Sequence, residues 1–489
     1  MADTTFAAEL AAASAAGAVV DGVARRTANN DRFRRLSQRA PIRDVRDYPV
    51  MASPPTIEDA GAYTTVPSGY GNYRVSTLAN PESLYTIYGG VAVNPAAGMR
   101  AKAVSMPSGV AQQYFATRVA SQIDADIFYV LCNPSTFGCR FLINGQYVSL
   151  SYTIPAGGSG IQMIKLTLPS VRQFRLDVEG GADFIFQGLL IPTGRTIRKV
   201  DTASVWREAF YGDSTAASTI GGAVAGASSA PDGYNVWMGK LLGGIDYDPV
   251  QIALGSTGVI TAGQYHNAMA HIDDLGQQVY HGVTSNMGIN DTVRAAASFT
   301  GSISGDVLTV TAIAAGNQIR TGPGGAISGF AGLVPGTEIL RIIATNGVGI
   351  GTYRLNTNYS SAVSSTSMFG TAITASDVTA AYLAWFQGIR QRAPFAYVTQ
   401  LGVSRGDTSD AVATEAAIKA AFDIWADPNG GFVPYQLANP KLFTGNAADP
   451  DTGNARFYFV TTDNVHAALA GQRFQAGYTA EAIRGLPRP

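Results

Sequence analysis

From about residue 200 onward, short apolar segments alternate with stretches of helical periodicity, and this alternation restricts the possible folds most strongly. The apolar segments end near Tyr211, Leu254, Thr284, Gly402 and Thr461. Helices are predicted at Ser376 to Arg392 and at Ser409 to Asp427. Strands that alternate with helices pair in parallel, because the crossover helix returns the chain to the same end of the sheet. The sequence therefore predicts an α/β domain with a parallel sheet and helices on both sides.

The first apolar segment ends in Ala209-Phe210-Tyr211 and runs directly into Gly212-Asp213-Ser214. A tight turn here places the Ser214 hydroxyl at the carboxyl edge of the sheet, where open α/β folds bind their ligands. The same tripeptide also serves as an ordinary turn or helix cap. Ser214 is the candidate nucleophile, and that role requires a base, a group that orients the base, and donors for an oxyanion.

Downstream segments supply each of these groups. Asp463 and His466 are three residues apart, a spacing that puts both on one face of a helical turn. Asp463 then accepts the Nδ1 proton of His466 while Nε2 faces Ser214, as in a Ser-His-Asp triad. A Gly-x-Asn-Asp segment contributes the side-chain amide of Asn290 as an oxyanion donor, and Gly255 contributes a backbone N–H.

The order of these segments resembles the four sequence blocks of the SGNH (GDSL-type) hydrolase family: Gly-Asp-Ser, a glycine loop, Gly-x-Asn-Asp and a C-terminal Asp-x-x-His. The resemblance covers Val205 to Ser298 and Ala372 to Pro489, and the glycine block matches least closely. It implies a flavodoxin-like parallel sheet, and neither a cofactor nor a metal. The implied roles are Ser214 as nucleophile, His466 as base, Asp463 as its orienting acid, and Gly255, Asn290 and the Ser214 N–H as oxyanion donors. Ala467 follows the histidine where many relatives have proline, which affects the stiffness of that loop rather than its chemistry.

The rest of the chain divides into further units, since 489 residues are enough for two to four hydrophobic cores. The predicted units are a helical docking or oligomerisation arm (1–47), a Pro/Gly-rich connector (48–99), a β-sandwich (100–199), the two parts of the hydrolase domain (200–298 and 372–489) and an inserted β module (299–371). We expect little regular structure in the connector.

In the N-terminal arm, apolar and small residues recur at alternating spacings of four and three: Phe6, Leu10, Ala13, Gly17, Val20 and Ala24. This stripe indicates a helix with a packing face. A helix so poor in large side chains is marginal alone, so it either docks on its own chain or associates with other copies or partners. Acidic residues at Asp3 and Glu9 argue against a signal peptide. The later cluster from Arg25 to Arg39 fits a solvated or partner-facing surface better than an RNA site.

Period-two alternation, as in Ile164 to Leu168, predicts the β-sandwich, and Asn144-Gly145 predicts a hairpin within it. Some bacterial and phage SGNH proteins have a similar sandwich before the catalytic domain, which implies a carbohydrate-facing or scaffolding module; a structural lid is the alternative. The insert, beginning with Ser302 to Ile313, resembles a Thr/Gly-rich module of phage tail and appendage proteins, and its position predicts one wall of the substrate cleft. Cys132 and Cys139 either form a disulfide or remain thiols.

Composition excludes other classes of function. A net charge of −1 with 14% charged residues argues against nucleic-acid binding, and no apolar run is long enough to span a bilayer. His266, His271 and His281 lie near two aspartates, but their spacing does not define a metal site, and a surface or packing role is favoured.

These features predict a serine esterase that deacetylates a bacterial surface polysaccharide, as part of an extracellular appendage of a phage or virus-like particle. The expected partners are acetylated glycan, other particle proteins at the N-terminal arm, and further copies of the chain. One alternative is a spike or tail protein that binds glycan without turnover. Another is a secreted lipase-like enzyme, which the missing signal peptide and the lack of a long apolar lid disfavour.

Overall fold

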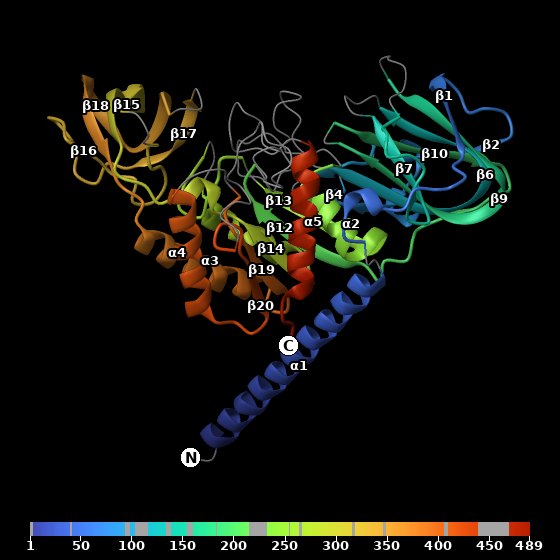
Figure 1. Cartoon of the computed structure of the whole chain (residues 1–489), viewed down its shortest axis with the longest axis horizontal. Helices are drawn as coiled ribbons and strands as arrows, with labels where there is room; N and C mark the ends of the chain where they lie inside the picture. Colours follow the sequence, from blue (N-terminus) through green and yellow to red (C-terminus); the bar gives the residue numbers. More distant parts are fainter. Residues whose placement is uncertain are drawn as a thin grey trace.

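Five parallel strands form the central sheet of the protein in the computed structural model (Figure 1). They are β12 (Trp206–Gly212), β13 (Tyr247–Ala253), β14 (Gly282–Asn286), β19 (Tyr397–Leu401) and β20 (Gly430–Val433), in the order β13-β12-β14-β19-β20. All neighbouring pairs are parallel, so the predicted mixed α/β architecture is confirmed. The structure describes residues 3–39, 42–92, 98–102, 116–133, 138–153, 160–181, 183–214, 232–253, 255–263, 267–314, 318–345, 349–404, 409–438 and 469–489.

Helices cover both faces of this sheet. They are α1 (Asp3–Arg39), α2 (Tyr234–Gly243), α3 (Ala375–Arg392), α4 (Ser409–Trp425) and α5 (Leu469–Gly485). On β12, Ala209 and Tyr211 join a buried cluster with residues of α3 and α4. Trp206 and Phe210 point to the opposite face and join a second cluster with residues of α1, α2 and α5. Because alternate residues of a strand face opposite sides, these two clusters bury both faces of β12, and among its seven residues only Arg207 is partly exposed.

Residues 56–198 form an antiparallel β domain at one end of the molecule (Figure 1). Its strands are β1 (Thr56–Ala62), β2 (Tyr70–Arg74), β3 (Thr86–Tyr88), β6 (Thr117–Asn133), β7 (Cys139–Ile143), β8 (Gln146–Tyr147), β9 (Gln162–Gly180), β10 (Ile185–Pro192) and β11 (Ile197–Arg198). The sequence predicts two stacked sheets here, whereas the described strands belong to one nine-stranded sheet. The long pair of β6 and β9 changes register between Ala125 and Ile127, and residues from both halves share one core. The predicted hairpin at Asn144-Gly145 joins β7 to β8.

The predicted connector differs from the structure. Within residues 48–99, β1 pairs with β9, β2 with β10 and β3 with β6, so this stretch is largely part of the β domain. A further short strand, β4 (Val91–Ala92), pairs with β5 (Ala101–Lys102). The described prolines of this stretch lie outside the strands, where a missing N–H removes no ladder hydrogen bond. Cys132 and Cys139 are both buried and unbonded, and their mutual contact together with burial raises the pKa of the Cys139 thiol.

An antiparallel sheet occupies residues 298–370, where the sequence predicts an inserted module. It consists of β15 (Ser298–Ile313), β16 (Ile327–Ser328), β17 (Ile339–Thr345) and β18 (Gly351–Gly370). The sheet has its own core, and Figure 1 shows it beside α3 and α4 at the end of the molecule opposite the β domain.

Helix α1 extends away from the body of the molecule, with the N-terminus at its far end (Figure 1). Its C-terminal part packs on its own chain: Phe33 lies edge-on against Trp206 with ring centroids 5.2 Å apart. Asn30 donates hydrogen bonds to Asn429 and to the Pro489 carbonyl. The C-terminal part of α1 is therefore docked on its own chain, as one of the two alternatives predicts. Association of the rest of α1 with other copies or partners stays a prediction.

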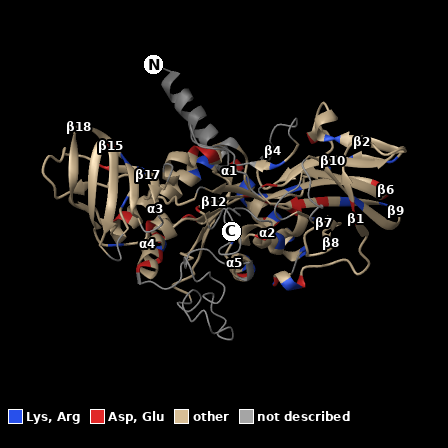
Figure 2. Cartoon of the chain, turned by 90° about the horizontal axis from the view of Figure 1, so that it is seen from above, with Lys and Arg blue, Asp and Glu red and all other residues tan. Residues whose placement is uncertain are grey.

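Charged residues of both signs are intermixed over the described chain (Figure 2), in keeping with the net charge of −1. Within the described ranges, every helix falls short of the length or hydropathy that a membrane span requires.

Candidate active site

Ser214 follows the carboxyl end of β12, an inner strand of the parallel sheet. Gly212, the last residue of that strand, pairs with Ala253 of β13 on one side and with Asn286 of β14 on the other. The three strands therefore end level with one another, and the turns that follow them start at the same edge. Asp213 is fully buried and Ser214 is half-buried at this edge.

Asn290 lies in the turn that follows β14. Gly288 begins this turn with a φ of 142°, a conformation that residues with a side chain rarely adopt, and a 3₁₀ turn then covers Ile289–Asp291. The Asn290 amide Nδ2 donates to Asp213 Oδ2 at 3.4 Å and to the Thr257 carbonyl at 3.0 Å. The turn after β14 therefore contacts both the Gly-Asp-Ser turn and the glycine loop.

The glycine loop, residues 255–263, follows β13. Gly255 is half-buried, and its carbonyl accepts a hydrogen bond from the Thr257 hydroxyl at 3.4 Å. The loop contains a second candidate donor, Gly258, but its N–H already donates to the Thr261 carbonyl at 2.8 Å. The role of Gly255 as a backbone donor stays a prediction.

Asp463 and His466 lie outside the described residues, so the triad itself stays a prediction. The described chain leaves β20 at the edge that carries Ser214, because β20 is parallel to β12 through β19 and β14. It ends at residue 438 and resumes with α5 at Leu469.

A buried carboxylate fixes the chain where it leaves this edge. Glu415 of α4 is fully buried and accepts backbone N–H groups from Val403, Tyr435, Gln436 and Leu437 at 2.8 to 3.0 Å. These residues follow β19 and β20, so a single side chain holds both loops.

Sequence reasoning missed Glu415 as well as Asp291, the buried neighbour of Asn290. Both carboxylates bind main-chain N–H groups, which every residue except proline has, so no residue pattern identifies their partners. The only sequence signal for Asp291 was its place in the Gly-x-Asn-Asp segment. For Glu415, the only signal was an acidic residue on the apolar side of a helix.

The described histidine nearest to a strand end, His281, has a structural role. It precedes β14, at the edge opposite Ser214, and its Nδ1 accepts the Arg207 backbone N–H at 3.0 Å. Arg32 of α1 contacts Nε2 at 2.8 Å. Burial, followed by the charges of Arg32 and Arg207, lowers the pKa of His281 to about 4. Among the described residues, no group of three or more metal-ligating side chains gathers.

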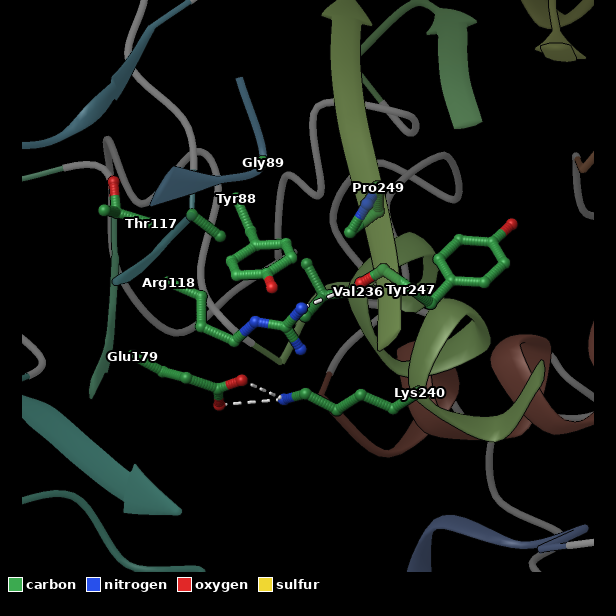
Figure 3. A pocket seen from close by; sticks show the side chains of 10 residues that line it. Tyr88, Gly89, Thr117, Arg118, Glu179, Val236, Lys240, Tyr247 and Pro249 are labelled. Atoms are coloured by element: carbon green, nitrogen blue, oxygen red, sulfur yellow. Dashed lines mark hydrogen bonds and ion pairs between the residues drawn. The ribbon is translucent and has the colours of Figure 1, made fainter. Parts of the chain in front are cut away.

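A small hollow lies between α2 and the β domain (Figure 3). Lys240 of α2 contacts both carboxylate oxygens of Glu179 at 2.7 and 2.8 Å, and Arg118 donates to the Tyr247 carbonyl at 2.8 Å. Burial, opposed by Glu179, lowers the pKa of Lys240 to about 8. Because Tyr247 starts β13, this hollow is at the amino edge of the sheet, and its Lys240–Glu179 ion pair and Arg118–Tyr247 hydrogen bond join the β domain to the central domain.

Neither a protein-family model nor a curated protein sequence matches the chain. Several solved structures are similar in fold. A family two carbohydrate esterase from Clostridium thermocellum, solved with cellohexaose, has a TM-score of 0.46 at 11% identity, over 81% of this chain and 98% of that one. The acetyl xylan esterase Est2A from Butyrivibrio proteoclasticus has a TM-score of 0.43 at 12% identity, covering 85% and 98%. A GDSL-like lipase from Bacteroides ovatus has a TM-score of 0.40 at 9% identity, covering 76% and 86%.

Proposed function

We propose that this protein is a serine esterase of the SGNH type. Ser214 is the nucleophile, His466 the base and Asp463 the acid that orients it, while Asn290, Gly255 and the Ser214 N–H bind the oxyanion. The observation that carries this proposal is the contact of the Asn290 amide with Asp213 and Thr257. That amide joins three turns at one edge of the sheet, through residues that are more than thirty positions apart in the sequence.

The proposed reaction is acyl transfer in two steps. The Ser214 hydroxyl attacks the ester carbonyl as His466 accepts its proton, and the Asn290 amide and backbone N–H groups stabilise the resulting oxyanion. Collapse of the tetrahedral intermediate expels the alcohol, which takes the proton from His466. Water, activated by the same histidine, then attacks the acyl-enzyme and releases the acid with free Ser214.

An acetylated bacterial surface polysaccharide is the substrate we favour. The insert lies against the glycine loop: Ile342 N–H donates to the Gly263 carbonyl at 2.9 Å, and the Thr321 hydroxyl donates to the Ala262 carbonyl at 2.5 Å. A β module fixed beside the proposed oxyanion donors provides a lateral wall, which suits a long polymer better than a small ester.

The broader proposal is that the esterase belongs to an extracellular appendage of a phage or virus-like particle, as an oligomer joined to other particle proteins through α1. Support comes from the projection of α1 from the body and from the sequence resemblance of the insert to phage appendage modules. Light scattering of the purified chain tests the oligomer: we expect a mass of several copies that falls to one copy when residues 1–20 are deleted, and a monomeric full-length chain would contradict it.

The experiment that tests the activity measures acetate release from acetylated polysaccharide and from 4-nitrophenyl acetate. We expect turnover by the wild type and by the control Ser360→Ala, an exposed serine of β18, and loss of most of the rate in Ser214→Ala. Glycan binding by both wild type and Ser214→Ala, with turnover by neither, would instead show a receptor that binds glycan without hydrolysis.

A further inference from the structure

Asp291 occupies a position next to the site that the proposed reaction does not use. Its side chain is fully buried, and its carboxylate accepts three consecutive backbone N–H groups of the glycine loop: Val259 at 2.6 Å, Ile260 at 3.1 Å and Thr261 at 2.8 Å. The hydroxyl of Tyr382, on α3, donates a fourth hydrogen bond at 3.0 Å. Burial raises the pKa of Asp291, although all four hydrogen bonds act in the opposite direction.

The glycine loop is shaped around this carboxylate. A Cβ atom added to Gly258 would lie 2.1 Å from Asp291 Oδ1, a distance that no side chain tolerates. Only glycine therefore allows the loop to approach the carboxylate this closely.

The same loop is tied to Asn290 at two points. The Asn290 amide donates to the Thr257 carbonyl at 3.0 Å, and the Thr261 hydroxyl donates to the Asn290 carbonyl at 2.8 Å. Asp291 is the next residue in the chain and binds the backbone between those points. The glycine loop and the Gly-x-Asn-Asp turn therefore hold one another in a fixed relation, with Asp291 at the centre.

The opposite side of the loop is also restrained. Gly322 and Thr321 of the insert lie against it: the Ala262 N–H donates to the Thr321 carbonyl at 3.4 Å, and a Cβ on Gly322 would meet the Ile260 carbonyl at 2.5 Å. With the insert on one side and Asp291 on the other, the loop has little freedom to shift.

We infer that Asp291 is the positioning residue of the oxyanion hole. It sets the distance between the Asn290 amide and the glycine loop without touching the substrate, and Tyr382 in turn orients Asp291. This inference rests on the proposed esterase function. Its physical reason is that oxyanion donors stabilise the transition state only when they are held in place before the reaction, so a displacement of about 1 Å costs up to about 100-fold in rate.

The test is steady-state kinetics of Asp291→Asn with 4-nitrophenyl acetate, together with its rate of modification by a fluorophosphonate. Asparagine keeps the volume and one acceptor oxygen, but it replaces the other carboxylate oxygen with an NH₂ group, which cannot accept a hydrogen bond from a loop N–H. We expect kcat and the phosphonylation rate to fall together by about 10- to 100-fold, with KM changed less than about 3-fold. A partly unfolded sample would instead lower the amplitude of phosphonylation and leave its rate constant unchanged.

The matched control is Glu208→Gln. Glu208 is also buried and hydrogen-bonded, to Trp206, Tyr247 and Thr284, but it lies near the amino end of β12. We expect this variant to lose thermal stability while its kcat stays within about 2-fold of wild type, because it removes a buried carboxylate without affecting the oxyanion donors.

If Asp291→Asn does not fold, Tyr382→Phe provides the second variant, since it removes one donor to Asp291 and leaves the loop intact. We expect a fall in kcat of about 3- to 10-fold at unchanged KM. If Asp291→Asn folds and keeps the wild-type kcat, the inference about Asp291 is overturned, whereas the proposed esterase function is not. If Asp291→Asn does not fold, a wild-type kcat of Tyr382→Phe has the same consequence. A wild type that neither hydrolyses esters nor reacts with the fluorophosphonate overturns the proposed function as well.

Discussion

The backbone N–H of Tyr234, at the start of α2, donates to Gln472 Oε1 in the first turn of α5 at 2.9 Å. Tyr234 lies close to where the described chain resumes after Ser214, and Gln472 follows His466 by six residues. The segment that follows Ser214 and the segment that contains His466 therefore lead into residues that are in contact with each other. This contact supports the proposal that the nucleophile and the base meet at one edge of the sheet.

Asn290→Ala tests the proposed oxyanion hole. Removing one side-chain donor from such a site typically lowers kcat by about 10²- to 10³-fold, because the donor acts mainly on the transition state. We expect this fall for the aryl acetate, with little change in KM. Asn358→Ala, at an exposed position of β18, is the control. A kcat within about 3-fold of wild type would remove Asn290 from the proposed mechanism.

Lys240→Met tests the ion pair that joins the β domain to the central domain. Loss of the lysine leaves Glu179 buried without its closest cation, since the Arg140 guanidinium is 3.6 Å away. Removing one partner of a buried pair usually costs about 3–5 kcal/mol, and we expect a decrease of that size in the free energy of unfolding by urea. Lys199→Met, at an exposed position, should change it by less than about 0.5 kcal/mol. Equal stability of the two variants would show that the domain interface does not depend on this pair.

The pH dependence of stability tests the environment of His281, whose pKa is lowered to about 4. An unfolded histidine binds a proton below about pH 6.5, so between pH 6.5 and 4 the unfolded state holds more protons than the folded state. The wild type should therefore lose stability as the pH falls from 7 to 4, by up to about 3 kcal/mol from this residue. In His281→Asn this contribution should be absent, so the difference in free energy of unfolding between the wild type and the variant should change with pH. The other histidines are present in both proteins, and parallel stability curves from pH 7 to 4 would contradict the prediction.

The central domain was predictable because its signals are local. The helix predicted at Ser376 to Arg392 is α3, and Thr374 and Asp377 form the capping box that begins it. The strands of the sheet are almost wholly buried, and short apolar segments such as Ala209-Phe210-Tyr211 mark them in the sequence. The hairpin at Asn144-Gly145 is similarly encoded by a turn dipeptide with neighbours close in sequence.

The features that the sequence did not reveal depend on distant partners. In the predicted connector, Thr56 pairs with Thr167 and Leu189 with Tyr73, and short strands between prolines and glycines carry little signal of such pairing. Asp291 was likewise not singled out, because its partners are main-chain N–H groups thirty or more residues away.

The central claim is that Ser214 is a nucleophile activated by His466, and covalent labelling tests it most directly. The purified chain is treated with a fluorophosphonate, and the adduct is located by intact mass and peptide mapping. We predict one adduct, on Ser214, that is absent from Ser214→Ala and forms at least about 100-fold more slowly in His466→Ala. An unmodified wild type, or an adduct on another serine, would contradict the account.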